Sequence, residues 1–201
     1  MRMLNNIQLS PHFSLLELTE SATARQRDIA NIPPPEAVEN LKRLCKGTLE
    51  PLRKALGLPV IITSGYRCKE LNNIVNRSSK TSQHMQGCAA DFYVSSAGSM
   101  RQSRGSRLKV QGQSDLKVDD KVQCGKAAVQ DSKVLGRREL LIMGFRLIIL
   151  NEDIDYDQLI LYPTFIHVSY VSRSKNRRKI IKANGHGTYC TVTREAALCL
   201  S

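Results

Sequence analysis

The sequence contains no tryptophan, and aromatic residues make up only 5% of its 201 residues. So few aromatics disfavour a surface on which the bases of a single-stranded nucleic acid would stack. None of the six cysteines forms a C-x-x-C pair, so a zinc site built from thiolates is not expected. The first ten residues lack the apolar core and cleavage site of a secretory signal. No apolar run is long enough to span a bilayer. We therefore expect synthesis in the cytoplasm, with cysteines that are free thiols.

Positive charge, by contrast, is in excess, with a formal net charge of +12 at pH 7. Residues 95–138 contain ten Lys and Arg against four Asp and Glu, and residues 173–182 contain six Lys and Arg and no acid. The rest of the chain is therefore close to neutral. Two interpretations stay open: solvated, flexible basic segments, or surfaces that attract a polyanion such as an anionic cell wall or a nucleic acid.

The length and a hydrophobic content of 41% predict one globular domain with a real core. We expect a single domain over residues 1–182 and a C-terminal tail over residues 183–201. A low-complexity basic insertion at about 95–134 interrupts the domain. It is rich in Ser, Gly, Gln and Lys, and this composition buries too little apolar surface to favour a packed structure.

The strongest helix signal lies in the first third of the chain. Apolar residues recur every three or four positions from Val38 to Leu56, which predicts an amphipathic helix. Pro35 suits the first helical position, and Gly57 is placed to end the helix. The leucines of this pattern are expected to lie in the core.

Strand patterns follow in several short segments. Strands are expected over residues 59–64, 88–94, 157–162 and 165–170, and a further helix over 135–150. A Pro163-Thr164 turn joins the last two strands. This order of elements predicts an α+β domain in which helices pack on a small, mostly antiparallel sheet.

The stretch from Ser82 to Asp91 carries the clearest chemistry. His84 lies in a polar loop, seven positions before an Asp at the start of a strand. Gly87 lets the chain reverse between them, so that both side chains meet at one ion. Imidazole nitrogen and carboxylate oxygen are both good zinc ligands. Without further context, however, a His and an Asp at this spacing are more often surface or capping residues.

That context comes from a family resemblance. Ser82-x-His84-x-x-Gly87-x-Ala89-x-Asp91 resembles the S-x-H-x-x-G-x-A-x-D signature of the M15 zinc peptidases at every fixed position. This family includes D-Ala-D-Ala carboxypeptidases, D-Ala-D-Ala dipeptidases and phage endolysins that cut L-alanyl-D-glutamate. Residues 62–67 resemble the family's strand and S-G-Y-R turn, and residues 165–169 resemble its last ligand-bearing strand. The likeness covers residues 11–182 apart from the insertion, and it is closest to the short phage- and prophage-like branch.

The resemblance implies the fold that M15 peptidases share with the hedgehog signalling domain. It also implies a Zn²⁺ ion held by His84, Asp91 and His167, with the fourth position left for water. Arg67 resembles the family's arginine near the metal, which assists the developing oxyanion or grips a substrate carboxylate. We expect Ser82 to lie at the substrate-binding side and to orient His84 or its loop.

One departure from the family concerns the catalytic base. Many members place a Glu three residues before the last His, where this chain has Thr164. Two acids, Asp155 and Asp157, lie on or just before the strand that leads to the His167 hairpin. We assign the role of base to Asp157, with Asp155 as the alternative. A purely structural role for Asp157 at the start of the strand is an equal alternative.

The sequence thus predicts a zinc metallopeptidase that hydrolyses peptidoglycan stem peptides, with D-Ala-D-Ala carboxypeptidase as the first assignment. Two alternatives stay open: an L-alanyl-D-glutamate endopeptidase of the endolysin kind, and a catalytically weak, zinc-containing protein that binds cell wall. We expect a peptidoglycan peptide as substrate, contact between the basic segments and an anionic cell wall, and action on the wall after release from the cytoplasm. A nucleic-acid partner is disfavoured.

Overall fold

The computed structural model describes residues 7–75, 79–96, 135–184 and 188–200. Nearly all of the predicted insertion at 95–134 lies outside these residues. No helix in the described part of the chain is long and apolar enough to cross a membrane.

Seven α-helices and two irregular helical turns form in the described residues. The helices are α1 (Leu15–Thr19), α2 (Ala22–Gln26), α3 (Pro35–Leu44), α4 (Glu50–Leu56), α5 (Lys69–Ile74), α6 (Arg137–Leu150) and α7 (Arg194–Leu198); the turns are the π-helical η1 (Cys45–Leu49) and the 3-10 turn η2 (Gln83–Gln86). The helix predicted from Pro35 to Leu56 is confirmed as the continuous run of α3, η1 and α4, and Gly57 caps its end.

The π-helical turn within this long helix has a local use. Because η1 departs from the regular α-helical bonding pattern, groups within it are available to other parts of the chain. The Gly47 carbonyl accepts a hydrogen bond from the backbone N–H of Asp155 at 3.1 Å. The Thr48 hydroxyl donates to the Asp155 carbonyl at 2.5 Å. The turn therefore holds the segment around Asp155, which leads into the strand that begins at Gln158.

The main sheet has six strands in the order β3-β4-β6-β5-β7-β8. Its strands are β3 (Val60–Ser64), β4 (Ala89–Val94), β5 (Gln158–Leu161), β6 (Ile166–Ser169), β7 (Lys179–Ala183) and β8 (Tyr189–Thr191), and a separate pair is formed by β1 (Gln8–Ser10) and β2 (Phe13–Ser14). All neighbours in the main sheet are antiparallel except β5 and β7, which are parallel. The predicted α+β class is confirmed, and the sheet is mixed.

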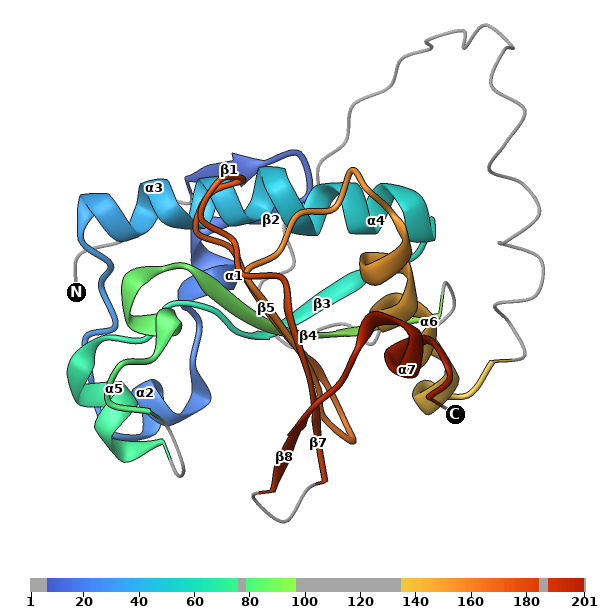
Figure 1. Ribbon diagram of the computed structural model, residues 1–201. Coiled ribbons are helices and arrows are strands. Elements are labelled where there is room, and N and C mark those ends of the chain that lie inside the picture. The colour runs from blue at the N-terminus through green and yellow to red at the C-terminus, as the bar shows by residue number, and fades with distance from the viewer. Residues whose placement is uncertain (1–6, 76–78, 97–134, 185–187, 201) are drawn as a thin grey trace, which may run out of the picture.

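Two strands form where the sequence analysis expected none. The basic run 173–182 was expected to face solvent, but β7 begins inside it and buries Ile180 and Ile181. Residues 183–201 were expected to form a tail with a last helical turn or two from Thr193; α7 lies there and buries Ala197, but the same residues also contribute β8 to the sheet. In Figure 1, β7 and β8 form a hairpin-like pair that extends below the rest of the sheet.

One face of the sheet packs against helices, and the other carries the candidate site. Along a strand, successive side chains point to opposite faces. In β4, Phe92 and Val94 are buried, and the Cγ2 atom of Val94 lies close to Gly144 of α6. The helices α3, α4 and α6 cover this side of the sheet (Figure 1). Asp91 alternates with these core residues, so it points to the opposite face, where the candidate site lies.

Candidate metal centre and active site

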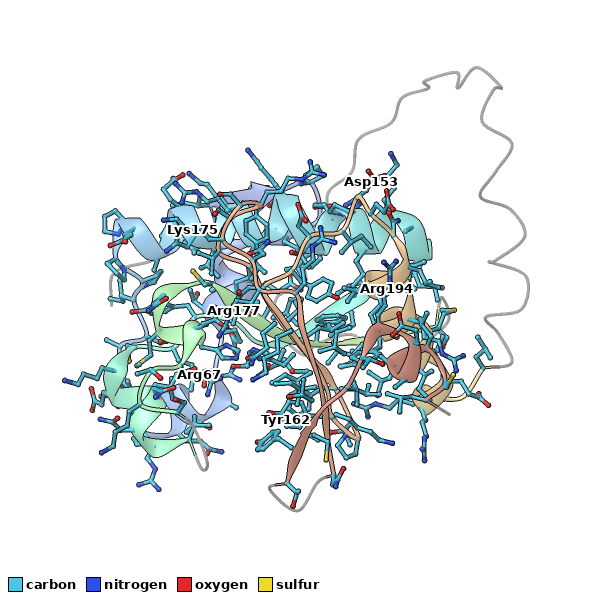
Figure 2. The ribbon with its side chains drawn as sticks, in the orientation of Figure 1. Arg67, Asp153, Tyr162, Lys175, Arg177 and Arg194 are labelled. Atoms are coloured by element: carbon cyan, nitrogen blue, oxygen red, sulfur yellow. The ribbon has the colours of Figure 1, made fainter. Side chains whose placement is uncertain are left out.

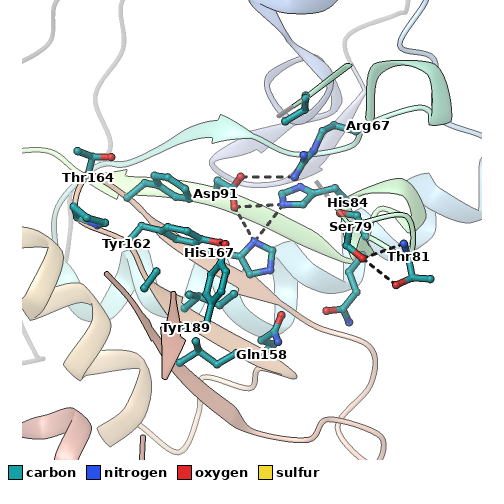
Figure 3. Close-up of a pocket in the computed structure, with 18 of the residues that line it drawn as sticks. Arg67, Ser79, Thr81, His84, Asp91, Gln158, Tyr162, Thr164, His167 and Tyr189 are labelled. Carbon is teal, nitrogen blue, oxygen red and sulfur yellow. Dashed lines mark hydrogen bonds and ion pairs between the residues drawn. The ribbon is translucent and has the colours of Figure 1, made fainter. Parts of the chain in front are cut away.

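Three side chains from distant parts of the sequence converge at one point of the sheet. His84, Asp91 and His167 form a group of possible metal ligands among the described residues. The Nε2 atom of His84 lies 3.2 Å from Nδ1 of His167 and 3.3 Å from Oδ1 of Asp91. The same carboxylate oxygen lies 2.7 Å from Nδ1 of His167. Figure 3 shows the three groups facing one another. The structure therefore brings together all three residues that the resemblance implied as ligands.

Strand register explains how His167 reaches the other two residues. Asp91 of β4 and His167 of β6 are direct partners in the antiparallel ladder. Residues opposite each other in such a ladder point to the same face, with Cβ atoms about 4.5–5.5 Å apart. A shift of one residue would turn His167 into the helix-covered core. The pairing of β4 with β6 thus places the side chains of Asp91 and His167 side by side without help from a bound metal.

His84 is placed by a tight local turn. It lies in η2, which ends at Gly87 with φ of 70°. A Cβ atom at Gly87 would lie 2.3 Å from the carbonyl oxygen of Ala37, so only glycine fits this close approach to α3. The Nδ1 atom of buried His84 lies 2.7 Å from the carbonyl oxygen of Gly65. A carbonyl only accepts, so Nδ1 donates, and in the neutral ring the Nε2 lone pair faces the cluster.

The electrostatics of the cluster keep Asp91 ionised. Burial raises the pKa of this carboxyl, but the adjacent His84 and His167 oppose burial, and the net pKa of Asp91 lies well below its usual range. Burial also lowers the pKa of His84, against the influence of Asp91. A carboxylate and a neutral imidazole are the forms in which these groups bind metals.

Arg67 completes the charged part of the site. Its side chain is buried, and its Nη2 atom lies 3.9 Å from Oδ2 of Asp91. Burial lowers the pKa of Arg67, although Asp91 and Tyr162 raise it. Its Nε atom is buried and has no hydrogen-bond partner among the described residues. A buried donor without a partner is costly, so a hydrogen-bond acceptor on a bound ligand would interact favourably with Arg67 Nε.

A pocket of about 1100 Å³ opens over this cluster. Its lining includes Arg67, Ser82, His84, Asp91 and His167. Ser82 is the N-cap of η2, and its carbonyl accepts a hydrogen bond from the backbone N–H of Met85. Its backbone thus supports the turn that carries His84. Among the described lining residues, Asp91 is the single carboxylate.

Asp157, the predicted base, has a different environment. It is buried, and it is not part of the pocket lining. Its Oδ1 accepts hydrogen bonds from the backbone N–H and Nε of Arg177, at 2.8 and 2.9 Å. Its Oδ2 accepts from Nη2 of Arg177 at 2.5 Å and from Gln83 at 2.9 Å. Burial opposes ionisation, yet Arg177 and Gln83 lower the pKa of Asp157 to about 2. This environment is typical of a structural ion pair and disfavours proton transfer near neutral pH.

Asp155 is also held by arginines. Its carboxylate lies 2.7 Å from Nη2 of Arg178 and 3.4 Å from Nε of Arg173. Together with Arg177, these residues belong to the basic run that was expected to contact an anionic envelope. All three arginine side chains are at least half exposed, but each is paired with Asp155 or Asp157. Part of the positive charge of this run therefore anchors the loop between β6 and β7.

One wall of the pocket is aromatic, and the sequence analysis did not identify it. Tyr162 stacks on Phe165, with ring centroids 4.3 Å apart, and Tyr189 of β8 meets Tyr162 edge-on at 6.2 Å. The two phenol oxygens lie 3.4 Å apart. Burial, Tyr189 and the charge of Asp91 raise the pKa of Tyr162. Strand alternation from His167 would have pointed to Phe165, whereas Tyr189 carried no sequence signal because β8 was not expected.

Comparison with known proteins supports the same family. Residues 11–119 match a family model described as Peptidase M15. This segment is just over half of the chain and includes His84 and Asp91, while His167 follows it. Comparison with curated proteins and with solved structures gives no significant match. The matched segment and the His-Asp-His cluster in the pocket lead to one conclusion: the chain belongs to the M15 peptidases, a family of zinc-dependent peptidases linked to peptidoglycan.

Proposed function

We propose that this protein is a zinc-dependent D-Ala-D-Ala carboxypeptidase that acts on peptidoglycan stem peptides. The observation that carries the proposal is the convergence of His84, Asp91 and His167 beside buried Arg67 in one open pocket. Three protein ligands with access from solvent are typical of catalytic zinc sites, whereas structural sites are closed by four protein ligands.

The donor atoms fit zinc in both chemistry and spacing. Tetrahedral bonds of about 2.0–2.1 Å separate neighbouring ligand atoms by about 3.3 Å. Two of the three separations in the cluster are 3.2 and 3.3 Å, and the third is 2.7 Å. The hydrogen bond from His84 to Gly65 is the kind of supporting contact that orients a metal-bound imidazole. A zinc ion held here would polarise the scissile carbonyl and lower the pKa of a bound water.

Arg67 favours a substrate that carries a carboxylate near the scissile bond. Its guanidinium is buried, permanently charged and incompletely hydrogen-bonded, and Asp91 is engaged by the two histidines. A planar guanidinium binds a carboxylate through two parallel hydrogen bonds. The terminal carboxylate of a D-Ala-D-Ala peptide would provide this partner. In the reaction, the water oxygen bonds to the carbonyl carbon, the carbon–nitrogen bond breaks, and both water protons finish on the departing amine.

The decisive experiment is incubation of zinc-loaded protein with purified muropeptides, followed by mass spectrometry. Loss of a single terminal alanine supports the carboxypeptidase assignment. Cleavage between L-alanine and D-glutamate instead identifies the endopeptidase alternative. No cleavage, together with binding to insoluble peptidoglycan, identifies a zinc-containing binding protein, an alternative favoured by the lack of a second acid in the described pocket lining. The His167→Ala variant is the matched control, because it removes a proposed ligand and leaves Arg67 in place.

A further inference from the structure

The described pocket offers few groups that assist a reaction besides the metal ligands and Arg67. Asp91 belongs to the cluster itself, Asp157 is occupied by Arg177 and Gln83, and Thr164 is exposed at the β5–β6 turn. Among the other described lining residues, Tyr162 offers a phenol that can donate a hydrogen bond. Figure 3 shows the Tyr162 and Tyr189 rings on the side of the site where His167 lies.

Strand register puts Tyr162 on the correct face of the sheet. Ile160 of β5 pairs with His167 of β6, so these two side chains share a face. Tyr162 follows Ile160 by two residues, and its backbone N–H donates to the Phe165 carbonyl at 3.0 Å. The alternation of side chains therefore keeps Tyr162 beside His167 on the open face. Tyr162 lines the same pocket as Asp91 and Arg67, and Figure 3 shows its ring beside His167.

The Tyr162 ring is fixed on two sides. Phe165 stacks against it with an interplanar angle of 15°, and Tyr189 approaches it at 85°. Such stacked and edge-on aromatic pairs are favourable beyond the area they bury, so they hold the ring in place. The Tyr189 hydroxyl, 3.4 Å from that of Tyr162, further limits where the phenol points. A donor held in place before the reaction stabilises developing charge without reorganising at that moment.

We propose that the Tyr162 hydroxyl donates a hydrogen bond to the carbonyl oxygen of the scissile amide as that oxygen gains negative charge. The inference rests on the hydrolysis proposed above and assigns a hydrogen-bond donor to the carbonyl oxygen that zinc would polarise, across the pocket from Arg67. A phenol suits this task because its ordinary pKa of about 10 keeps it protonated at neutral pH. Tyr162 keeps its proton throughout, and Tyr189 acts as a positioning residue that holds the Tyr162 ring.

The test compares Tyr162→Phe with wild-type protein, both loaded with zinc. The variant retains the ring and its stacking and loses only the hydroxyl. We expect kcat on the cleaved muropeptide to fall about 10²-fold, the usual effect of removing one oxyanion donor, while KM stays within about threefold, since an uncharged amide oxygen gains little from the lost bond. Tyr170→Phe is the matched control: Tyr170 packs against Gly47 and does not line the pocket, so its hydroxyl should be dispensable.

A second readout does not depend on turnover. A phosphinate dipeptide mimics the tetrahedral state, and its affinity can be measured by calorimetry beside that of the uncleaved amide of a D-amino-acid dipeptide. Tyr162→Phe should weaken phosphinate binding at least tenfold and leave amide binding and zinc affinity unchanged. Equal losses for both ligands, or a rise in KM with unchanged kcat, would overturn the oxyanion role in favour of simple substrate binding. If wild-type protein cleaves no muropeptide, the proposed function fails and this inference with it; normal cleavage by both proteins refutes this inference alone.

Discussion

Asp157→Asn separates the two roles considered for this residue, because each predicts a different measurable loss. In the folded protein, Arg177 and Gln83 lower the pKa of Asp157 from the ordinary value of 3.8 to about 2. Each pKa unit corresponds to about 1.4 kcal/mol, so the ionised carboxylate contributes about 2.5 kcal/mol to the free energy of unfolding. Asparagine keeps one acceptor but turns an amide group toward two donors, Arg177 Nη2 and Gln83 Nε2. We expect the variant to be less stable by about 2–3 kcal/mol near pH 6.

The pH dependence gives the sign of the effect. A carboxyl whose pKa is lower in the folded state stabilises the fold above the pKa of the unfolded state, and this stabilisation is lost as pH falls toward the folded pKa. The contribution of Asp157 is therefore complete above about pH 5, falls to about half at pH 3, and disappears below about pH 2. Wild-type and Asp157→Asn proteins should converge over this range, because a protonated carboxyl and an amide are both neutral.

The assay is urea unfolding of metal-free protein, followed by circular dichroism at pH 6 and at pH 3. Asp153→Asn is the control, since Asp153 is exposed and lies at the opposite edge of the molecule from Arg67 and Tyr162 (Figure 2). The zinc-loaded variant should retain hydrolysis of muropeptides at temperatures where it is folded. An unchanged free energy of unfolding at pH 6, with a rate about a hundredfold lower, would refute this reasoning and restore Asp157 as the base.

Three further outcomes test the site and the turn that carries it. Wild-type protein should bind one zinc per chain, and both His84→Ala and His167→Ala should lose it, as measured by metal analysis after dialysis; undiminished zinc in either variant contradicts the ligand set. Arg67→Lys keeps the charge but loses the planar fork, so kcat/KM should fall at least about tenfold with zinc affinity unchanged, and equal kinetics would show that charge alone suffices. Gly87→Ala places a methyl group 2.3 Å from the Ala37 carbonyl oxygen at a φ of 70°, so urea unfolding should reveal a loss of about 1–3 kcal/mol or more; wild-type stability would mean that the turn relaxes freely.

The parts of this protein that the sequence by itself determined depend on neighbours along the chain. The helix from Pro35 to Leu56 follows from apolar residues at three- and four-residue spacing, and its end from Gly57. The turn that separates His84 from Asp91 follows from Gly87, the one residue type that adopts the required φ without strain. Such features are set within a few residues, so a pattern read in one window is sufficient to predict them.

Only the tertiary structure decided how these pieces meet. The β4–β6 register puts His167 opposite Asp91, 76 positions earlier in the chain, and a shift of one residue would have separated them. The same sheet, extended by β7 and β8, brings Tyr189 to Tyr162. The loop before β7 supplies Arg177, which donates hydrogen bonds to Asp157. Asp157 has a sequence position that suits a catalytic base, but this contact holds it in an ion pair. Pairing between distant strands depends on the packing of the whole sheet, and no local sequence pattern encodes which side chains will face each other there.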